Sequence, residues 1–215
     1  LIFMNYFDIH THQISSCPSQ SITSVHATSL SIDKRIVYAS IGIHPWTLTE
    51  KNAQEQWNSL QQAVMDKRII AIGEAGIDKI KGPSLKIQTN IFQQEVILSE
   101  TMGLPLIIHC VRASNEIIQL KKKLMPLQPW IIHGFRNNIS IAQNLLQHGF
   151  YLSFGYQFQE DALKSVPLEK IFIETDESEE SIENIYRKIA SIRDMKVEKL
   201  VEAIKKNVQE IFFKA

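Results

Sequence analysis

The sequence predicts an α/β fold of the (β/α)-barrel type, and three observations support this prediction. Short apolar runs alternate with segments whose apolar residues recur at helical spacing, as in a mainly parallel sheet covered by helices. Five of these runs stop at a histidine or an acidic residue. Metal-binding side chains at the points where buried strands end are typical of the active-site end of such a barrel. No repeat or composition shift divides residues 1–215, so we expect a single domain.

The apolar runs are the clearest strand signal in the chain. They are, in order, Val37 to His44, Ile69 to Glu74, Leu104 to His109, Trp130 to His133 and Lys170 to Asp176. A continuous apolar run of this length indicates a strand buried on both faces. Parallel strands present their carboxyl ends at one end of a barrel, so we expect the terminal side chains of all five runs to converge there.

The first strand carries two further histidines, in the motif Asp8-Ile-His10-Thr-His12. Successive strand side chains point to opposite faces, so His10 and His12 share one face, with Asp8 on the same side. His-x-His alone is a weak metal signal, because many histidines only satisfy hydrogen bonds within the fold.

The segment between this motif and His44 departs from the regular pattern. Ile22 to Thr28 is a weak strand, and the turn-like segment before Val37 is shorter than the dozen or so residues of a parallel crossover. We therefore expect a shortened N-terminal part that contains an antiparallel hairpin, with no helix before Ala53.

Downstream of Trp46, predicted helices alternate with the strands. Apolar residues such as Trp57, Leu60 and Val64 recur at helical spacing. The predicted helices cover residues 53–65, 85–101, 113–124, 139–148, 158–165, 181–192 and 197–213, and a further strand covers 150–154. This alternation predicts a mainly parallel sheet.

Charge and cysteine content limit the functional classes. The 23 Lys and Arg residues balance the 23 Asp and Glu residues, so no broad basic field is present to capture nucleic acid. Cys17 and Cys110 make no disulfide framework, which favours a reducing compartment. No apolar run approaches the roughly 18 residues of a membrane span, and too few residues precede Asp8 for a signal peptide. We expect a cytoplasmic protein that does not associate with a membrane and has no obligate protein partner.

The strand-end residues predict a metal centre. Six candidate ligands share this placement: His10, His12, Glu74, His109, His133 and Asp176. A buried run does not normally end in a carboxylate without a partner, because burying an unpaired charge is costly. Imidazole with carboxylate suits zinc, manganese or magnesium and leaves the choice among them open. We expect two divalent metal ions, whose charge would exceed that of two carboxylates and attract an anionic substrate.

Other polar residues have simpler interpretations. His26 lies in the irregular N-terminal part, where we expect a structural role. Cys110 follows His109 and points to the opposite face of its strand, which favours a core position over a nucleophile. His148 lies in the last turn of a predicted helix, where the helix dipole favours a cationic cap.

The ordered motifs resemble those of the TatD-related deoxyribonucleases, which are divalent-metal hydrolases with a distorted TIM barrel. The matching segments span nearly the whole chain: Asp8-Ile-His-Thr-His12, Gly42-Ile-His-Pro45, Ile72-Gly-Glu-Ala-Gly-Ile-Asp78, Leu104-Pro-Leu-Ile-Ile-His109, His133-Gly-Phe135 and Glu174-Thr-Asp176.

The resemblance implies a role for each candidate residue. One metal would be held by His10, His12, Glu74 and Asp176, and a second by Glu74, His109 and His133, with Glu74 bridging the two. His44 would contact the substrate phosphate or leaving group. Asp176 would orient the attacking water and accept its proton, which makes Asp176 and Glu74 the candidate catalytic residues. The implied reaction is phosphodiester hydrolysis, with DNA ends as one candidate substrate.

Several segments depart from the family pattern. The span from His12 to His44 is short, the loop after Asp176 is short, and Val111 stands where the family has an arginine. Arg112, one place later, is our candidate replacement for substrate binding. Two alternatives therefore remain open: hydrolysis of an amide, ester or phosphomonoester, and a catalytically silent metal-binding scaffold.

Overall fold

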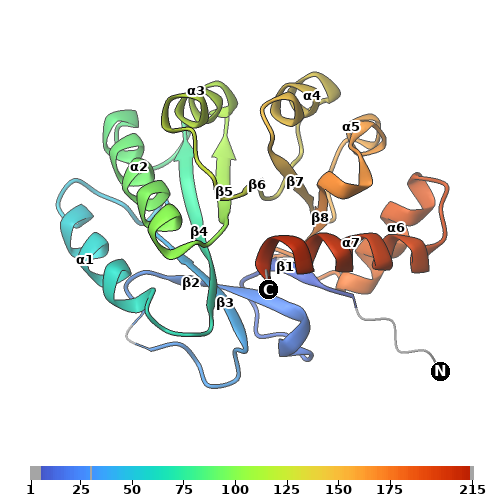
Figure 1. Ribbon diagram of the computed structural model, residues 1–215, viewed down its shortest axis with the longest axis horizontal. Helices are drawn as coiled ribbons and strands as arrows, with labels where there is room; N and C mark the ends of the chain where they lie inside the picture. The colour runs from blue at the N-terminus through green and yellow to red at the C-terminus, as the bar shows by residue number, and fades with distance from the viewer. Residues whose placement is uncertain (1–5, 30, 214–215) are drawn as a thin grey trace.

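The predicted (β/α) barrel is confirmed. The computed structural model describes residues 6–29 and 31–213, and its strands form one eight-stranded sheet in the order β1 to β8. Every neighbouring pair in the sheet is parallel. The strands form a nearly closed barrel (Figure 1). Their bounds are β1 Asp8–Thr11, β2 Ser21–His26, β3 Tyr38–Gly42, β4 Ile69–Asp78, β5 Leu106–Val111, β6 Trp130–Ile132, β7 Tyr151–Phe154 and β8 Ile171–Ile173.

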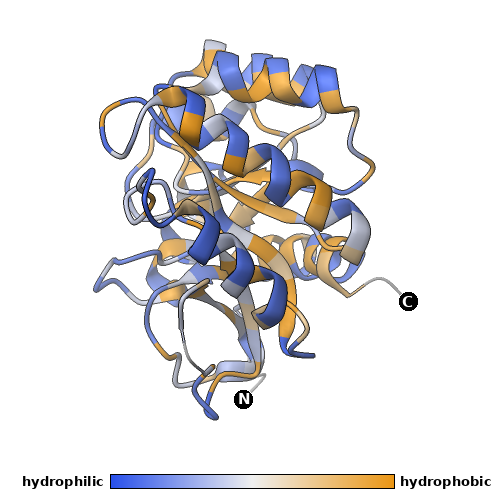
Figure 2. Ribbon diagram, turned by 90° about the vertical axis from the view of Figure 1, so that its left-hand side faces the viewer, coloured by the Kyte–Doolittle hydropathy of each residue, from blue (hydrophilic) through white to orange (hydrophobic). Residues whose placement is uncertain are grey.

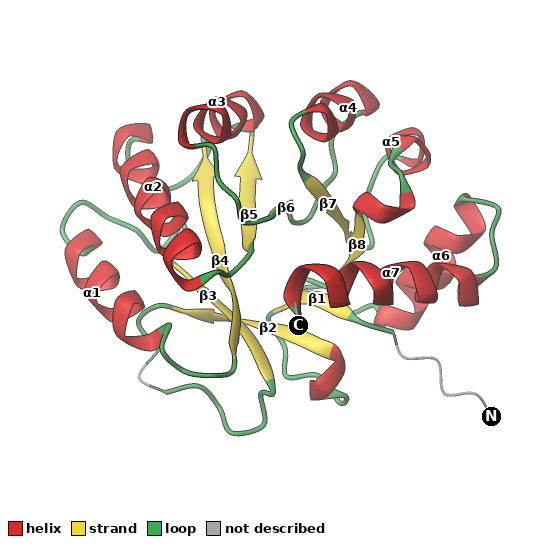
Figure 3. Cartoon of the chain, in the orientation of Figure 1, coloured by secondary structure: helices red, strands yellow, loops and turns green. Residues whose placement is uncertain are grey.

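Helices surround the strands on the outside of the barrel (Figure 3). From Ala53 onward they begin and end within two residues of the predicted positions, because local apolar spacing defines them. Their bounds are α1 Ala53–Ala63, α2 Leu85–Met102, α3 Ser114–Leu124, α4 Ile139–Gln147, α5 Glu160–Ser165, α6 Ile182–Ile192 and α7 Val197–Phe212, with 3-10 helices η1 Pro18–Gln20 and η2 Leu168–Lys170. None of the described helices combines the length and apolar character that a membrane crossing requires.

The predicted antiparallel hairpin is wrong, because β2 and β3 pair in parallel from Ile22 with Tyr38 to His26 with Gly42. The return lies between these two strands, and its described residues, 27–29 and 31–37, form no helix or strand. Extended chain advances up to about 3.3 Å per residue, so this loop is long enough to pass back along a short strand without a helix. Ile32 and Ile36 anchor it in the core. Before Ala53, the described residues contain one helical element, the short η1.

Strand β4 is longer than predicted, continuing past Glu74 to Asp78. Its pairing with β5 gains one residue between Ile72 and Ala75, which is the signature of a β-bulge. Gly76 lies inside this strand with φ of 148°, and a Cβ there would collide with the carbonyl oxygen of His109. The close approach of β4 and β5 therefore requires glycine at this position.

The barrel closes between β1 and the segment after β8. Thr11 bridges to Asp176, and the Asp176 N–H donates to the carbonyl of His10 at 2.9 Å. The Thr175 hydroxyl donates to the Asp8 carboxylate at 2.6 Å. Asp8, expected on the same side as His10 and His12, thus ties the two ends of the barrel together.

The core fills the barrel and the layer between strands and helices. Trp130 is fully buried, and its ring contacts Phe92 and Phe150 edge-on with centroid distances of 5.3 and 5.8 Å. The helices carry both hydrophilic and hydrophobic residues (Figure 2), as expected for helices with one face on a core. This packed frame fixes the strand ends on which the polar cluster is built.

Candidate metal centre

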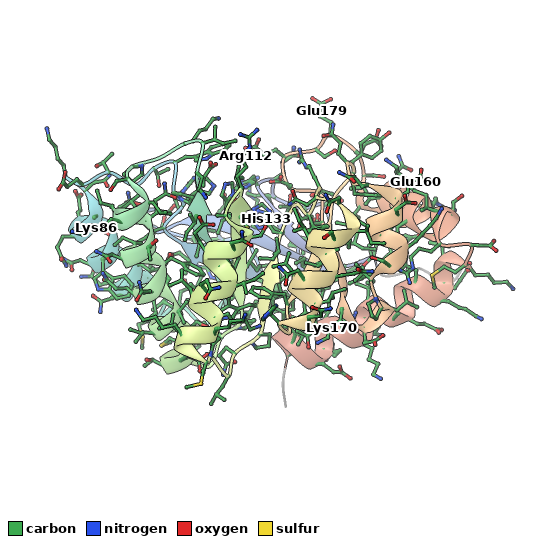
Figure 4. All side chains as sticks on the ribbon, turned by 90° about the horizontal axis from the view of Figure 1, so that it is seen from above. Lys86, Arg112, His133, Glu160, Lys170 and Glu179 are labelled. Atoms are coloured by element: carbon green, nitrogen blue, oxygen red, sulfur yellow. The ribbon has the colours of Figure 1, made fainter. Side chains whose placement is uncertain are left out.

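The carboxyl ends of the strands bring the predicted ligands together. The cluster comprises His10 and His12 at β1, His44 after β3, Glu74 in β4, His109 in β5, His133 after β6 and Asp176 after β8. Most of these residues line a cavity of about 260 Å³. Arg112 and Glu179, which follow β5 and β8, lie on the opposite side of the molecule from Lys170, which precedes β8 (Figure 4).

Glu74 is the centre of the cluster, and its two oxygens face different histidines. Its Oε1 lies 2.7 Å from His109 Nδ1 and 2.8 Å from His133 Nε2. Its Oε2 lies 3.3 Å from His12 Nε2 and 3.5 Å from His10 Nε2. We call these the Oε1 side and the Oε2 side. This division is the geometry that a carboxylate bridging two cations requires.

Asp176 completes the Oε2 side. Its Oδ1 lies 3.5 Å from His12 Nε2 and 3.8 Å from His10 Nε2. In a tetrahedral site with bonds of about 2.0–2.1 Å, neighbouring ligand atoms are about 3.3 Å apart. The distances from the Nε2 atoms of His10 and His12 to the two carboxylates are therefore close to those between ligand atoms of a metal site.

His10 supports the same interpretation. Its side chain is fully buried, and neither ring nitrogen has a hydrogen-bond partner among the described residues. An unpaired buried polar atom is costly, and a cation would give Nε2 a partner. Groups of ligand atoms within 4.8 Å of one another include His10, His12 and Glu74, and also His10, His133 and Asp176.

Two carboxylates that the sequence analysis did not select orient the histidines of the Oε1 side. Asp78 Oδ2 lies 3.1 Å from His109 Nε2, and Glu174 Oε1 lies 3.3 Å from His133 Nδ1. A carboxylate at one ring nitrogen holds the proton there and leaves the other nitrogen's lone pair for a metal. In both histidines that other nitrogen faces Glu74.

His44 is built differently. Its Nδ1 accepts the backbone N–H of Trp46 at 3.0 Å, so the neutral ring carries its proton on Nε2. That Nε2 lies 3.0 Å from Glu74 Oε1. With a proton on Nε2, His44 is a hydrogen-bond donor, although a further group of candidate ligand atoms joins it with Glu74 and His109.

The protonation of the cluster follows from its mixed charges. Burial alone would raise the pKa of Glu74, but His133 and the other imidazoles outweigh it and hold that pKa well below its ordinary range. Burial opposes the charged form of His133, yet Glu74 and Glu174 raise the pKa of this imidazole well above its ordinary value. Metal binding would therefore displace a proton from the Oε1 side.

Asp176 has a more exposed setting. Burial first, and then the charge of Glu174, raise its pKa above the ordinary value. The guanidinium of Arg136 lies 3.9 Å from its Oδ2. A divalent cation beside Asp176 would act in the opposite direction and favour the charged carboxylate.

Two arginines each follow a strand-end histidine by three residues, Arg112 after His109 and Arg136 after His133. Arg112 is exposed with φ of 51°, immediately after β5 ends, so strand alternation does not decide its direction. It has no hydrogen bond or ion pair among the described residues. Arg136, which the sequence analysis passed over, follows His133-Gly-Phe and reaches Asp176. The signal for Arg136 was its position three residues after a strand-end ligand.

Three further residues with expected structural roles are His26, Cys110 and His148. His26, expected to be structural, is exposed and lines the cavity with His12 and His44. Cys110, expected in the core, is partly buried against it, and burial raises the pKa of its thiol to about 11. His148 ends α4 and contacts the carbonyl of Asn144 at 2.8 Å.

Glu95, on the buried face of α2, was also missed. It accepts the N–H of Ile43 at 2.7 Å and so anchors the strand end that carries His44. Its other oxygen has no hydrogen-bond partner among the described residues, and burial raises its pKa well above the ordinary value. Its spacing of three and four residues from Phe92 and Ile91 was the available signal.

Known proteins are similar to this chain in sequence. The family described as TatD related DNase matches residues 8–213. An uncharacterized metal-dependent hydrolase of Bacillus subtilis, YabD, is 26% identical over 82% of this chain and 77% of its own length. The 3'-5' RNA nuclease TATDN2 of Homo sapiens is 28% identical over 66% of this chain and 20% of that protein.

The fold is likewise shared with a solved structure. The crystal structure of YJJV, a TatD homolog from Escherichia coli, matches with a TM-score of 0.81 at 18% identity, covering 99% of both chains. The family match extends from the first residue of β1 to the end of α7, across the whole barrel and every candidate ligand. This chain belongs to the TatD related DNase family.

Proposed function

We propose that this metal-dependent hydrolase cleaves phosphodiester bonds at nucleic-acid strand ends, using two divalent cations. The proposal rests on the position of the two Glu74 carboxylate oxygens, which face different pairs of candidate metal-binding histidines. His10, His12 and Asp176 would hold one cation with Glu74, and His109 and His133 the other. Family membership and the nuclease activity named for the human relative support a nucleic-acid substrate.

Divalent cations in such a centre polarise the phosphoryl group and lower the pKa of water. The chain's own residues supply the remaining steps. His44 is oriented by the Trp46 N–H to donate from Nε2, and it would bond a phosphoryl oxygen as negative charge develops. Asp176, at the open edge of the cluster, would orient the attacking water and accept its proton. Arg112 and Arg136 would contact flanking phosphates.

The test combines metal analysis with a substrate screen. Purified protein would be stripped with a chelator, reloaded with zinc, manganese or magnesium, and assayed on single-stranded DNA, single-stranded RNA, bis-p-nitrophenyl phosphate, phosphomonoesters, esters and amides. We expect about two metal ions per chain and metal-dependent cleavage of the diesters. Cleavage of amides, esters or phosphomonoesters alone would replace the phosphodiester proposal with one of those activities. If fully metal-loaded protein hydrolyses none of these substrates, the phosphodiesterase proposal and the alternative hydrolase activities are both refuted.

A further inference from the structure

We propose that Trp46 and Lys81 form a nucleobase-binding subsite beside the metal centre, which makes an unpaired nucleotide the preferred substrate. This inference rests on the proposed function and specifies its substrate. Trp46 is a large aromatic residue left 50% exposed. It lines the same cavity as His12, His44 and His109. A base that reaches this cavity would therefore meet the indole.

The Trp46 ring is held in a fixed orientation. Its indole N–H donates to Asp78 Oδ2 at 2.6 Å, and Asp78 is buried. The ring contacts the imidazoles of His44 and His109 edge-on, with centroid distances of 5.0 and 5.6 Å. Stacking on an aromatic side chain already fixed in place loses little conformational entropy, and base stacking tolerates any sequence.

Lys81 adds a positive charge at the same place. Its Nζ lies 3.9 Å from the centroid of the Trp46 ring, which shows that a cation can reach that ring face. Lys81 is exposed, but its backbone N–H is anchored to Asp78 Oδ1 at 3.0 Å. The next residue, Gly82, lies so close to Pro45 that a Cβ would come within 2.5 Å of the Pro45 carbonyl oxygen. The loop that carries Lys81 therefore packs against the segment that carries Trp46.

Asp78 connects the subsite to the chemistry. One of its oxygens is shared by the Trp46 indole and His109, and the other accepts the backbone N–H groups of Ile80 and Lys81. The flat ring, the ammonium group and the candidate metal-binding histidine are thus fixed relative to one another.

A nucleotide combines the two features that this arrangement matches, a flat π surface and an adjacent anion. A base would stack on the indole, and the Lys81 ammonium would leave the ring for the neighbouring phosphate. A base inside a duplex is already stacked and paired, so the indole selects unpaired ends.

The test compares oligonucleotides with and without a base. Metal-loaded protein would be assayed on single-stranded DNA and RNA whose terminal or penultimate nucleotide is replaced by a stable abasic residue. Removing the base should lower kcat/KM about 10- to 100-fold. Trp46→Leu should lower kcat/KM on the base-containing strand by the same factor and should lose the discrimination. Trp46→Phe keeps a π surface without the indole N–H, and it should keep most of the discrimination.

Lys81→Gln should reduce the dependence of log kcat/KM on log salt by about 0.7, the value for one contact to a single strand. The matched control is Lys170→Gln. Lys170 also lies over a ring, at 4.0 Å from the Tyr151 centroid, but it precedes β8 and lies on the side of the molecule opposite Arg112 (Figure 4). This control should change neither discrimination nor salt dependence.

The outcomes separate the subsite from the proposed activity. Equal kcat/KM on abasic and base-containing strands would overturn the subsite while leaving phosphodiester hydrolysis intact. Loss of discrimination in Trp46→Phe equal to that in Trp46→Leu would assign Trp46 to holding Asp78, and would also overturn it. Failure of metal-loaded wild-type protein to cleave any oligonucleotide would overturn both proposals.

Discussion

On the Oε1 side of Glu74, both candidate metal-binding histidines are backed by a buried carboxylate, Asp78 behind His109 and Glu174 behind His133. On the Oε2 side, neither ring nitrogen of His10 has a hydrogen-bond partner among the described residues. The histidines of the Oε1 side are therefore oriented before any cation arrives, whereas His10 on the Oε2 side depends on the cation for its pairing. Since fixed ligands lose less entropy on binding, we expect the Oε1 side to bind its cation more tightly.

The largest effect is expected from Glu74→Gln, which removes the charge common to both sides. Both proposed cations should be lost, and hydrolysis should fall to the rate without protein. Metal content by mass spectrometry and turnover on single-stranded DNA would check this. Retention of two cations by this variant would show that the two sides do not share Glu74.

Asp176→Asn tests the Oε2 side alone. The substitution keeps the shape of the side chain but removes its charge and its ability to accept a proton. Loss of a general base typically costs about 10²–10⁴ in rate, and we expect the upper end of that range. The cation of the Oε1 side should remain bound, as metal analysis of the variant would show. Near-wild-type turnover at full metal occupancy would remove Asp176 from the mechanism.

Glu174→Gln and Asp78→Asn test the orienting carboxylates. Loss of such a partner typically lowers metal affinity about 10- to 100-fold, and the loss should be confined to the Oε1 side. Titration of the metal-free protein with zinc would measure the affinity of each site and so distinguish a weakened site from an unchanged one. Glu179→Gln, at an exposed acid after β8, provides the control. An equal weakening of both sides would mean that the two are not independently built.

Glu95→Gln extends the comparison to a buried carboxyl group without an imidazole. The pKa of Glu95 in the folded chain is raised well above the ordinary 4.5, so the folded state keeps a proton that the unfolded chain releases. Its contribution to stability is full below pH 4.5 and is lost as the pH rises toward the folded pKa.

The Gln variant does not titrate, so its free energy of unfolding should exceed that of wild type increasingly above pH 4.5. The gain should reach up to about 1.4 kcal/mol per pH unit. Urea unfolding of both proteins from pH 4 to pH 8 would measure this difference. A difference that does not change with pH would mean that Glu95 is ionised when folded.

The local sequence pattern was sufficient to predict much of the secondary structure of this protein. Apolar spacing predicted the helices from Ala53 onward and the strands they connect, because each pattern lies within one element. The placement of His109, His133 and Asp176 at or just after the ends of strands predicted that they meet, since parallel strands end on one side of a barrel. The motifs that follow one another from Asp8 to Asp176 predicted the family.

Strand direction and side-chain pairing were decided only in three dimensions. The sequence between β2 and β3 has no periodic pattern, so their parallel pairing depends on Ile32 and Ile36, which are buried in the core. Asp78, Glu174 and Glu95 lie dozens of residues from the groups they bond. Hydrogen bonds depend on distance and angle, which a linear sequence does not contain. The tertiary fold therefore determined which histidine nitrogens face Glu74.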